Sequence, residues 1–130
     1  MRSLLPSHEL TGLIISGAMS VHRALGPGFL ESVYERALIH ELRKSGLDVE
    51  RQRSMDVFYD GIVIGTFTAD LIVENCVIVE NKAVAVLLPA HEAQLVHYLT
   101  ATGLEIGLLL NFGSSSLQMK RKHRTPQANP

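Results

Sequence analysis

The sequence has a single cysteine and no apolar stretch long enough to cross a bilayer. Cys76 alone cannot form a disulfide within the chain, so the cysteine content suits a reducing compartment. The most apolar run near the start, residues 10–19, is about half as long as the roughly 20 residues of a transmembrane helix. We therefore expect a cytoplasmic protein with no membrane segment.

A strong excess of charge of either sign is also missing. The 130 residues include 12 Lys and Arg and 13 Asp and Glu, so no global positive field indicates nucleic-acid binding. Basic residues are nevertheless concentrated in "KRKHR" at 120–124. This cluster is consistent with a solvated tail, or with a strand end that contacts phosphate groups through Lys120, Arg121 and Lys122.

The length and the 46% hydrophobic content predict one soluble globular domain with one substantial core. We place this domain at residues 1–124 and expect a flexible C-terminal tail at 125–130. Apolar residues at helical spacing predict a first helix from about residue 7 to 25. Its apolar face would consist of Leu10, Leu13, Ile14, Ala18, Val21 and Leu25.

A second helix is predicted from about residue 30 to 45, with Val33, Ala37, Leu38 and Leu42 on its apolar face. The pattern then changes to a strand at 49–59, followed by an Asp60-Gly61 hairpin turn before "IVIGTF", a strand from about residue 66 to 73, and one at 76–85. A helix at 89–103, a strand at 105–112 and a short edge strand at 117–122 would follow. This order predicts an α/β fold: a mixed sheet of four to five strands, with a three-strand meander and a helical crossover, flanked by helices.

Charged residues interrupt the apolar strands in "ADLIVENCVIVENKAV", residues 69–84. Asp70, Glu80 and Lys82 would be costly to bury unless they are paired, hydrated or bound to a metal. Because strand side chains alternate between faces, Glu80 and Lys82 share one face and Asn81 points to the other.

The turn between these two strands decides whether Asp70 joins that face. In an antiparallel pair the residue numbers of opposed positions have a constant sum. A turn of three residues, Glu74-Asn75-Cys76, makes this sum 150 and so places Asp70 opposite Glu80. A two-residue turn would place Asp70 opposite Val79 and direct Glu80 away. Asp70 and Glu80 on one face would form an oxygen-rich site suited to Mg²⁺ or Mn²⁺, with Lys82 beside an activated water. The alternative is a structural ion pair of these carboxylates with Lys82 on a solvent-facing sheet.

Two further pairs lie at helical spacing. Gln94 and Tyr98 are four residues apart on the helix that follows the strand with Glu80, and Glu31 and Tyr34 share a face at the start of the second helix. Each pair also has a simpler explanation. Glu31 is favoured by the helix dipole alone, and Gln94 with Tyr98 could be an ordinary contact between a helix and the sheet.

Together these features resemble the PD-(D/E)XK nuclease superfamily, and more closely the small bacterial group named for its G-x-x-E-x-x-Y motif. That motif is present as Gly28-Phe-Leu-Glu31-Ser-Val-Tyr34, followed in order by the "ADLIVENCVIVENKAV" hairpin, "HEAQLVHYL" and "GLLLNFG". The resemblance covers roughly residues 8–122. Asn81 differs from the apolar residue that the family usually has between its Glu and Lys.

The resemblance implies a restriction-endonuclease-like core and a set of site residues. Asp70, Glu80 and Glu31 would hold Mg²⁺ or Mn²⁺, together with the backbone carbonyl of Asn81. Catalysis would involve Asp70, Glu80, Gln94 and Lys82, the last acting on the attacking water. Tyr98 and Tyr34 would support the site or contact the substrate.

We therefore expect a metal-dependent nuclease that hydrolyses phosphodiester bonds in DNA, or alternatively RNA. A non-catalytic module that binds nucleic acid or a protein on the same fold is the main alternative, and a different phosphoester hydrolase or a structural role is a further one. A homodimer or a larger nuclease complex is consistent with the small size of the chain. The six histidines show no zinc-ligand spacing, and Cys76 has no histidine partner evident for a catalytic thiol.

Overall fold

The computed structural model describes residues 7–126, so the expected tail at 125–130 lies mostly outside the described residues. The elements in this range are α1 Ser7–Leu25, α2 Glu31–Lys44, β1 Val49–Tyr59, β2 Ile62–Val73, β3 Val77–Lys82, α3 Pro89–Thr102, β4 Ile106–Asn111 and β5 Gln118–His123. None of the helices in this range combines the length and apolarity that a bilayer-spanning helix requires.

The five strands form one sheet in the order β1-β2-β3-β4-β5. β3 and β4 are parallel, and the other neighbouring strands are antiparallel. α3 is therefore the crossover that parallel strands require. Pro89 begins this helix, and Gly103, with a φ of +76°, follows its last residue, as expected from the preferences of helix ends. The predicted mixed sheet flanked by helices is confirmed.

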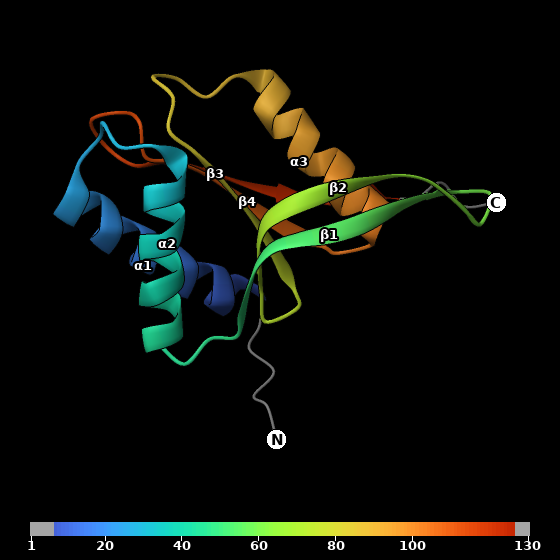
Figure 1. The fold of residues 1–130 in the computed structure, drawn as a ribbon, viewed down its shortest axis with the longest axis horizontal. Helices are drawn as coiled ribbons and strands as arrows, with labels where there is room; N and C mark the ends of the chain where they lie inside the picture. Colours follow the sequence, from blue (N-terminus) through green and yellow to red (C-terminus); the bar gives the residue numbers. More distant parts are fainter. Residues whose placement is uncertain (1–6, 127–130) are drawn as a thin grey trace.

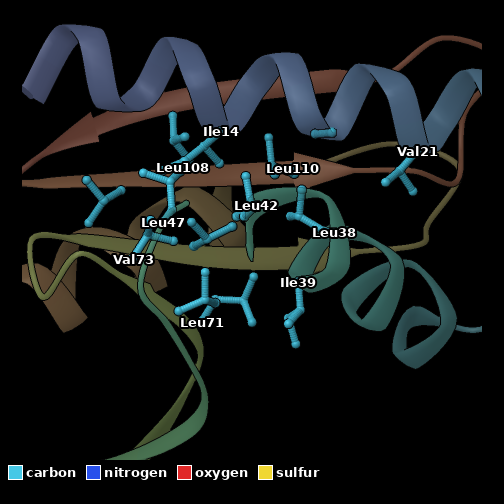
Figure 2. Packing of buried hydrophobic residues seen from close by; sticks show 14 of the residues in the cluster. Ile14, Val21, Leu38, Ile39, Leu42, Leu47, Leu71, Val73, Leu108 and Leu110 are labelled. Carbon is cyan, nitrogen blue, oxygen red and sulfur yellow. The ribbon is translucent and has the colours of Figure 1, made fainter. Parts of the chain in front are cut away.

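Helices cover both faces of the sheet, with α1 and α2 on one side and α3 on the other (Figure 1). The alternation of side chains along the interior strands divides the core accordingly. Val79 of β3 and Leu108 of β4 pack toward α1 and α2, whereas Ile78 and Leu109 pack toward α3. Figure 2 shows the larger cluster, in which side chains of α1 and α2 meet those of the strands.

The apolar faces of the first two helices differ in part from the prediction. Leu13 and Val33 are 40% and 37% exposed, whereas Tyr34 and Ile39 are buried. The reason is the close approach of α1 and α2 at Gly17, where an added Cβ would lie 3.1 Å from Leu42. This contact orients α2 so that the face centred on Tyr34 and Leu42 is buried, and Val33 lies at its border.

β1 and β2 continue beyond the sheet as a two-stranded ribbon (Figure 1). β2 pairs with β3 only over residues 71–73, so residues 62–69 have β1 as their one strand neighbour in the described chain. The predicted Asp60-Gly61 turn is confirmed, with φ values of +51° and +73°. Its flanks carry exposed apolar side chains: Phe58, Tyr59, Ile62, Val63 and Ile64.

Candidate active site

The hairpin between β2 and β3 has the register that brings Asp70 and Glu80 to one face. Leu71 pairs with Val79, and the turn consists of the three residues 74–76. Continuing this register by one residue places Asp70 opposite Glu80. The three-residue turn is therefore confirmed, and the two-residue alternative is excluded. β3 begins at Val77 rather than Cys76, because Cys76 belongs to the turn.

The two carboxylates are linked through the backbone of the opposite strand. The Asp70 N–H donates a hydrogen bond to Glu80 Oε2 at 2.9 Å, and the Asn81 N–H donates to Asp70 Oδ2 at 2.8 Å. Oδ1 of Asp70 and Oε1 of Glu80 receive no backbone N–H within residues 7–126, and the two carboxyl groups are close enough to share a side-chain hydrogen bond when one of them is protonated. The hairpin thus fixes both carboxylates side by side and leaves one oxygen of each available.

Ionisation of Glu80 is unfavourable in this position. The side chain is only 8% exposed. Burial and the neighbouring Asp70 carboxylate together raise the pKa of Glu80 to about 8, although the Asp70 N–H and the positive charge of Lys82 act in the opposite direction. At neutral pH the pair therefore retains a proton unless a cation compensates its negative charge.

Lys82 lies near this pair without forming an ion pair. No carboxylate oxygen in the described range lies within 4.0 Å of its Nζ, yet its charge acts on both Glu80 and Glu31. The alternative, a structural ion pair on a solvent-facing sheet, is not seen among the described residues, since Glu80 is buried and Lys82 has no carboxylate bound to it there. The ammonium group stays available for another partner.

The chain that follows Lys82 is fixed by the end of β4. Asn111 Nδ2 donates to the Val84 carbonyl at 2.8 Å, and the Val84 N–H donates to Asn111 Oδ1 at 3.0 Å. The Phe112 N–H donates to the Lys82 carbonyl at 2.9 Å. At Gly113 an added Cβ would lie 2.4 Å from Val84 backbone atoms. The residues of "NFG" therefore hold the backbone from which Lys82 projects.

The G-x-x-E-x-x-Y segment forms a loop that leads into α2. Tyr34 Oη donates to the Gly26 carbonyl at 2.5 Å and accepts from the Phe29 N–H at 3.1 Å. Gly28 has a φ of +121°, which residues with a side chain rarely adopt. Tyr34 itself is fully buried. The structure thus uses Tyr34 to hold the loop that precedes Glu31, rather than as a group that faces the carboxylate pair.

Glu31 is the first residue of α2 and lies within electrostatic reach of the pair. Burial raises the pKa of Glu31 above its usual range. The negative charges of Asp70 and Glu35 act in the same direction, and the positive charge of Lys82 acts against them. The loop therefore brings a third carboxylate toward Asp70 and Lys82 from a distant part of the chain.

α3 contributes Tyr98 from the opposite side. Its ring stacks on Phe67 of β2, with centroids 3.9 Å apart. Burial raises the pKa of the Tyr98 hydroxyl, and the charges of Glu80 and Asp70 add to this effect. Gln94, one turn earlier on the helix, is exposed and has no hydrogen bond within the described chain.

The predicted phosphate contacts on β5 are divided between the two faces of the sheet. Lys120 pairs with Leu109, the same β4 residue that pairs with Glu80, so Lys120 and Glu80 share a face roughly 10 Å apart across two strands. Lys122, on the same face, forms an ion pair with Glu92 of α3 at 3.0 Å. Arg121 points to the other face, where it hydrogen-bonds Thr11 of α1. The structure thus does not bring these three residues together.

Other residues near the site were not predicted from the sequence. Gln52, at the β1 position opposite Asp70, has a φ of +50° and donates through Nε2 to Glu35 Oε1 at 2.8 Å. Glu35 is 6% exposed and lies one turn after Glu31, so the four-residue spacing could have identified it. His91 at the start of α3 acts electrostatically on Glu31, and no motif indicated it.

The donor set suits a hard divalent cation. In the described range there is no group of three or more His, Cys, Asp or Glu side chains arranged to hold a metal ion, so Glu31 as a ligand stays a prediction. However, Mg²⁺ is commonly held by only one or two carboxylates, together with water and substrate phosphates. Asp70 and Glu80 supply such a pair; burial and, after it, the Asp70 charge raise the pKa of Glu80, and a bound cation would offset both effects.

Comparisons with known proteins agree with this fold. The sequence matches the PD-(D/E)XK nuclease superfamily over residues 8–123. A solved structure described as "Crystal structure of SSO0001" is similar, with a TM-score of 0.59 and 18% sequence identity. The similarity covers 74% of this chain and 50% of that one, and at this identity it concerns the fold alone. A search of curated proteins finds no significant match. Because the family match extends over nearly the whole chain, the protein belongs to the PD-(D/E)XK nuclease superfamily.

Proposed function

We propose that the protein is a Mg²⁺- or Mn²⁺-dependent nuclease that hydrolyses phosphodiester bonds, with DNA as its substrate. The observation that carries this proposal is the carboxylate pair of buried Glu80 and half-buried Asp70 beside an ammonium group with no ion-pair partner among the described residues. Structural carboxylates in such a position would be expected to bind the lysine. Membership of a nuclease superfamily supports the same activity.

In this proposal Asp70 and Glu80 bind the metal through the oxygens that the backbone leaves available. Glu31 and the Asn81 carbonyl complete the set directly or through water. The bound ion would supply positive charge for the scissile phosphate and lower the pKa of a bound water. The hairpin keeps the two carboxylates at a fixed separation, because each is hydrogen-bonded to the backbone of the other strand.

Lys82 orients the attacking water and stabilises negative charge that develops on the phosphate. This role needs an ammonium group that is not neutralised by a bound carboxylate, and Lys82 meets that condition among the described residues. Tyr98 and Gln94 contact the substrate from α3. Tyr34 supports the site indirectly, because it holds the loop that sets the position of Glu31.

We also propose that the protein belongs to the G-x-x-E-x-x-Y group within the superfamily. The support is physical: the motif glycine has a φ that favours glycine, its glutamate begins α2, and its tyrosine closes the loop between them. The glycine, glutamate and tyrosine that define the motif thus each have a separate structural role in this chain.

Cleavage of labelled DNA and RNA by purified protein tests the proposed activity. Wild-type protein should cleave with Mg²⁺ or Mn²⁺ and not with EDTA. Glu80→Gln and Lys82→Met should each reduce the rate by roughly a hundredfold or more, because each removes a charge from the reacting centre. Glu9→Gln, at an exposed position of α1, is the matched control and should cleave like wild type.

Two results would contradict the proposal. Metal-dependent cleavage that persists in both Glu80→Gln and Lys82→Met would locate the activity elsewhere. Binding of nucleic acid without cleavage under any metal condition, and unchanged by Glu80→Gln, would instead identify a non-catalytic binding module.

A further inference from the structure

A basic pocket lies between α2 and the start of β1, away from the carboxylate pair. Its volume is about 300 Å³, at the lower end of the range for ligand sites in proteins. α2 stands beside this part of β1 in Figure 1. The pocket is lined by Arg36, Ile39, His40, Arg43 and Arg51.

The positive charge of this pocket is only partly compensated. Glu35 lies 3.6 Å from Arg51 Nε, but the same oxygen also accepts the hydrogen bond from Gln52. Arg43 donates to the Val49 carbonyl, which carries no formal charge. Arg36 and His40 are exposed and have neither a hydrogen bond nor an ion pair with any residue between 7 and 126.

Three guanidinium groups and an imidazole around one cavity favour an anion with several oxygens. Arginine presents several N–H donors in a planar arrangement that matches phosphate. The protein as a whole has a formal charge of −1, so the positive charge is a local feature of this surface and not a consequence of composition. Phosphate groups are therefore the ligand chemistry that the pocket fits best.

The pocket is connected to the candidate active site through both of its elements. α2 begins at Glu31, and at about 1.5 Å per residue Arg36 and Arg43 lie roughly 7.5 and 18 Å further along the helix axis. On β1, Arg51 is adjacent to Gln52, which occupies the position opposite Asp70. A nucleic-acid strand has one phosphate about every 3.4 Å of duplex axis, so a strand at the carboxylate pair would pass several phosphates along α2.

We propose that this pocket binds backbone phosphates of the nucleic-acid strand on one side of the scissile bond. The inference rests on the proposed nuclease function for its substrate class. The pocket itself makes no contact with the reacting atoms. It holds the strand in a fixed register relative to Asp70 and Glu80, and its contribution is to affinity and salt dependence rather than to the chemical step.

Binding should be measured on the Glu80→Ala protein without divalent metal, so that failure of cleavage does not affect the result. The probes are fluorescent single-stranded and duplex DNA, titrated at several salt concentrations. Arg36→Ala and His40→Ala are then introduced together into the Glu80→Ala protein. This variant should bind DNA about tenfold more weakly, and the slope of log K against log salt should become shallower by about one for each lost phosphate contact. Both side chains are exposed, so the melting temperature should not change.

Arg23→Ala in the same Glu80→Ala protein is the matched control, because it removes an exposed helical arginine from α1. It should leave affinity and slope unchanged. If Arg23→Ala lowered the DNA affinity as much as the pocket variant does, the loss would be explained by the change in net charge alone, and the proposal would be overturned. Unchanged affinity in the Arg36→Ala, His40→Ala variant would overturn it as well. The proposal would also be overturned if inorganic phosphate or a mononucleotide competed with the labelled DNA as effectively as a longer strand does. That result would indicate a site for a free anion.

Discussion

At the scale of single residues, Glu80 shows how the fold opposes the charge that the proposed chemistry needs. Burial and Asp70 raise the pKa of Glu80 from 4.5 to about 8. Between these values the folded state binds a proton that the unfolded state has released. The contribution of Glu80 to the free energy of unfolding is therefore constant below this interval. It falls as the pH rises through the interval and stays at its lowest value above it.

Replacement of Glu80 by Gln should remove this pH dependence. We expect metal-free wild-type protein to lose a few kcal/mol of stability relative to Glu80→Gln between about pH 5 and about pH 9. Urea unfolding at a series of pH values measures this difference. Asp56→Asn, which changes an exposed carboxylate of β1, should keep the wild-type profile. Parallel profiles for wild type and Glu80→Gln would contradict the assigned environment of Glu80.

Asn81 is a second residue in an unfavourable environment, because its polar side-chain amide lies in an apolar part of the core. It is 1% exposed, and neither its Oδ1 nor its Nδ2 has a hydrogen-bond partner among the described residues. Its side chain points to the α1 and α2 face, where Val79 is its apolar neighbour along β3. Asn81→Val should therefore increase the free energy of unfolding by about 1–3 kcal/mol, as measured by denaturant titration.

Asn111→Val provides the opposite case for comparison. Asn111 is equally buried, but its side-chain amide accepts a hydrogen bond from the Val84 N–H and donates one to the Val84 carbonyl. This substitution should lower the free energy of unfolding, because it leaves Val84 polar groups unpaired. A loss of stability in Asn81→Val similar to that in Asn111→Val would show that the Asn81 amide has a stabilising partner.

At the scale of elements, the β2–β3 hairpin was predictable because turn length and side-chain alternation are local properties. Three polar or small residues, 74–76, separate two apolar runs. A turn with this odd number of residues places Asp70 opposite Glu80. The helix ends were equally local, since Pro89 and Gly103 mark them. By contrast, the exposure of Leu13 and Val33 depends on how α1 and α2 pack, which no local pattern determines.

The surroundings of the site were less predictable for the same reason. Gln52 occupies a left-handed conformation that its residue type does not indicate, and it reaches Glu35 from another element. The basic pocket combines α2 residues with Arg51 of β1, and a nearly neutral overall charge conceals it. Tyr34 was expected to support the site or contact the substrate, and only the structure shows that its hydroxyl donates to and accepts from the backbone of the loop before α2. Contacts between elements decided each of these outcomes.

The contact between the end of β4 and the chain after β3 can be tested with glycine substitutions. In Gly113→Ala the new Cβ would lie 2.4 Å from the Val84 backbone, so this segment must move. We expect a loss of about 1–3 kcal/mol in the free energy of unfolding. The shift should also displace Lys82 and reduce cleavage.

Gly12→Ala is the matched control for this substitution. An added Cβ at Gly12 meets no atom within 4 Å, and the residue lies inside α1. It should therefore stabilise the protein by roughly 0.5–1 kcal/mol. Equal effects of the two substitutions would contradict the close backbone contact at Gly113.

At the scale of the whole molecule, we propose that the ribbon formed by β1 and β2 pairs with the same ribbon of a second copy of the chain. Residues 62–69 carry no charged side chain, and within the described chain their outer edge has no strand neighbour. Natural proteins usually protect such edges with charges. Antiparallel pairing of two copies about a twofold axis would bring no like charges together.

Ile64→Lys should therefore shift a dimer toward monomer, because it introduces like charges near this axis. The measurement is molar mass by light scattering over a range of protein concentrations. Val86→Lys, which changes a similarly exposed apolar residue after β3, should leave the mass unchanged. A wild-type protein that stays monomeric at the highest concentration would contradict pairing through the ribbon.

The proposed function depends on a metal site formed by Asp70 and Glu80 beside Lys82, which has no ion-pair partner between residues 7 and 126. The most direct measurement is a crystal soaked with Mn²⁺ above about pH 8, where the proton on the pair no longer competes with the metal. We expect an anomalous difference peak that contacts Oδ1 of Asp70 and Oε1 of Glu80. A crystal with no peak there, and with Lys82 Nζ bound to these carboxylates instead, would contradict it.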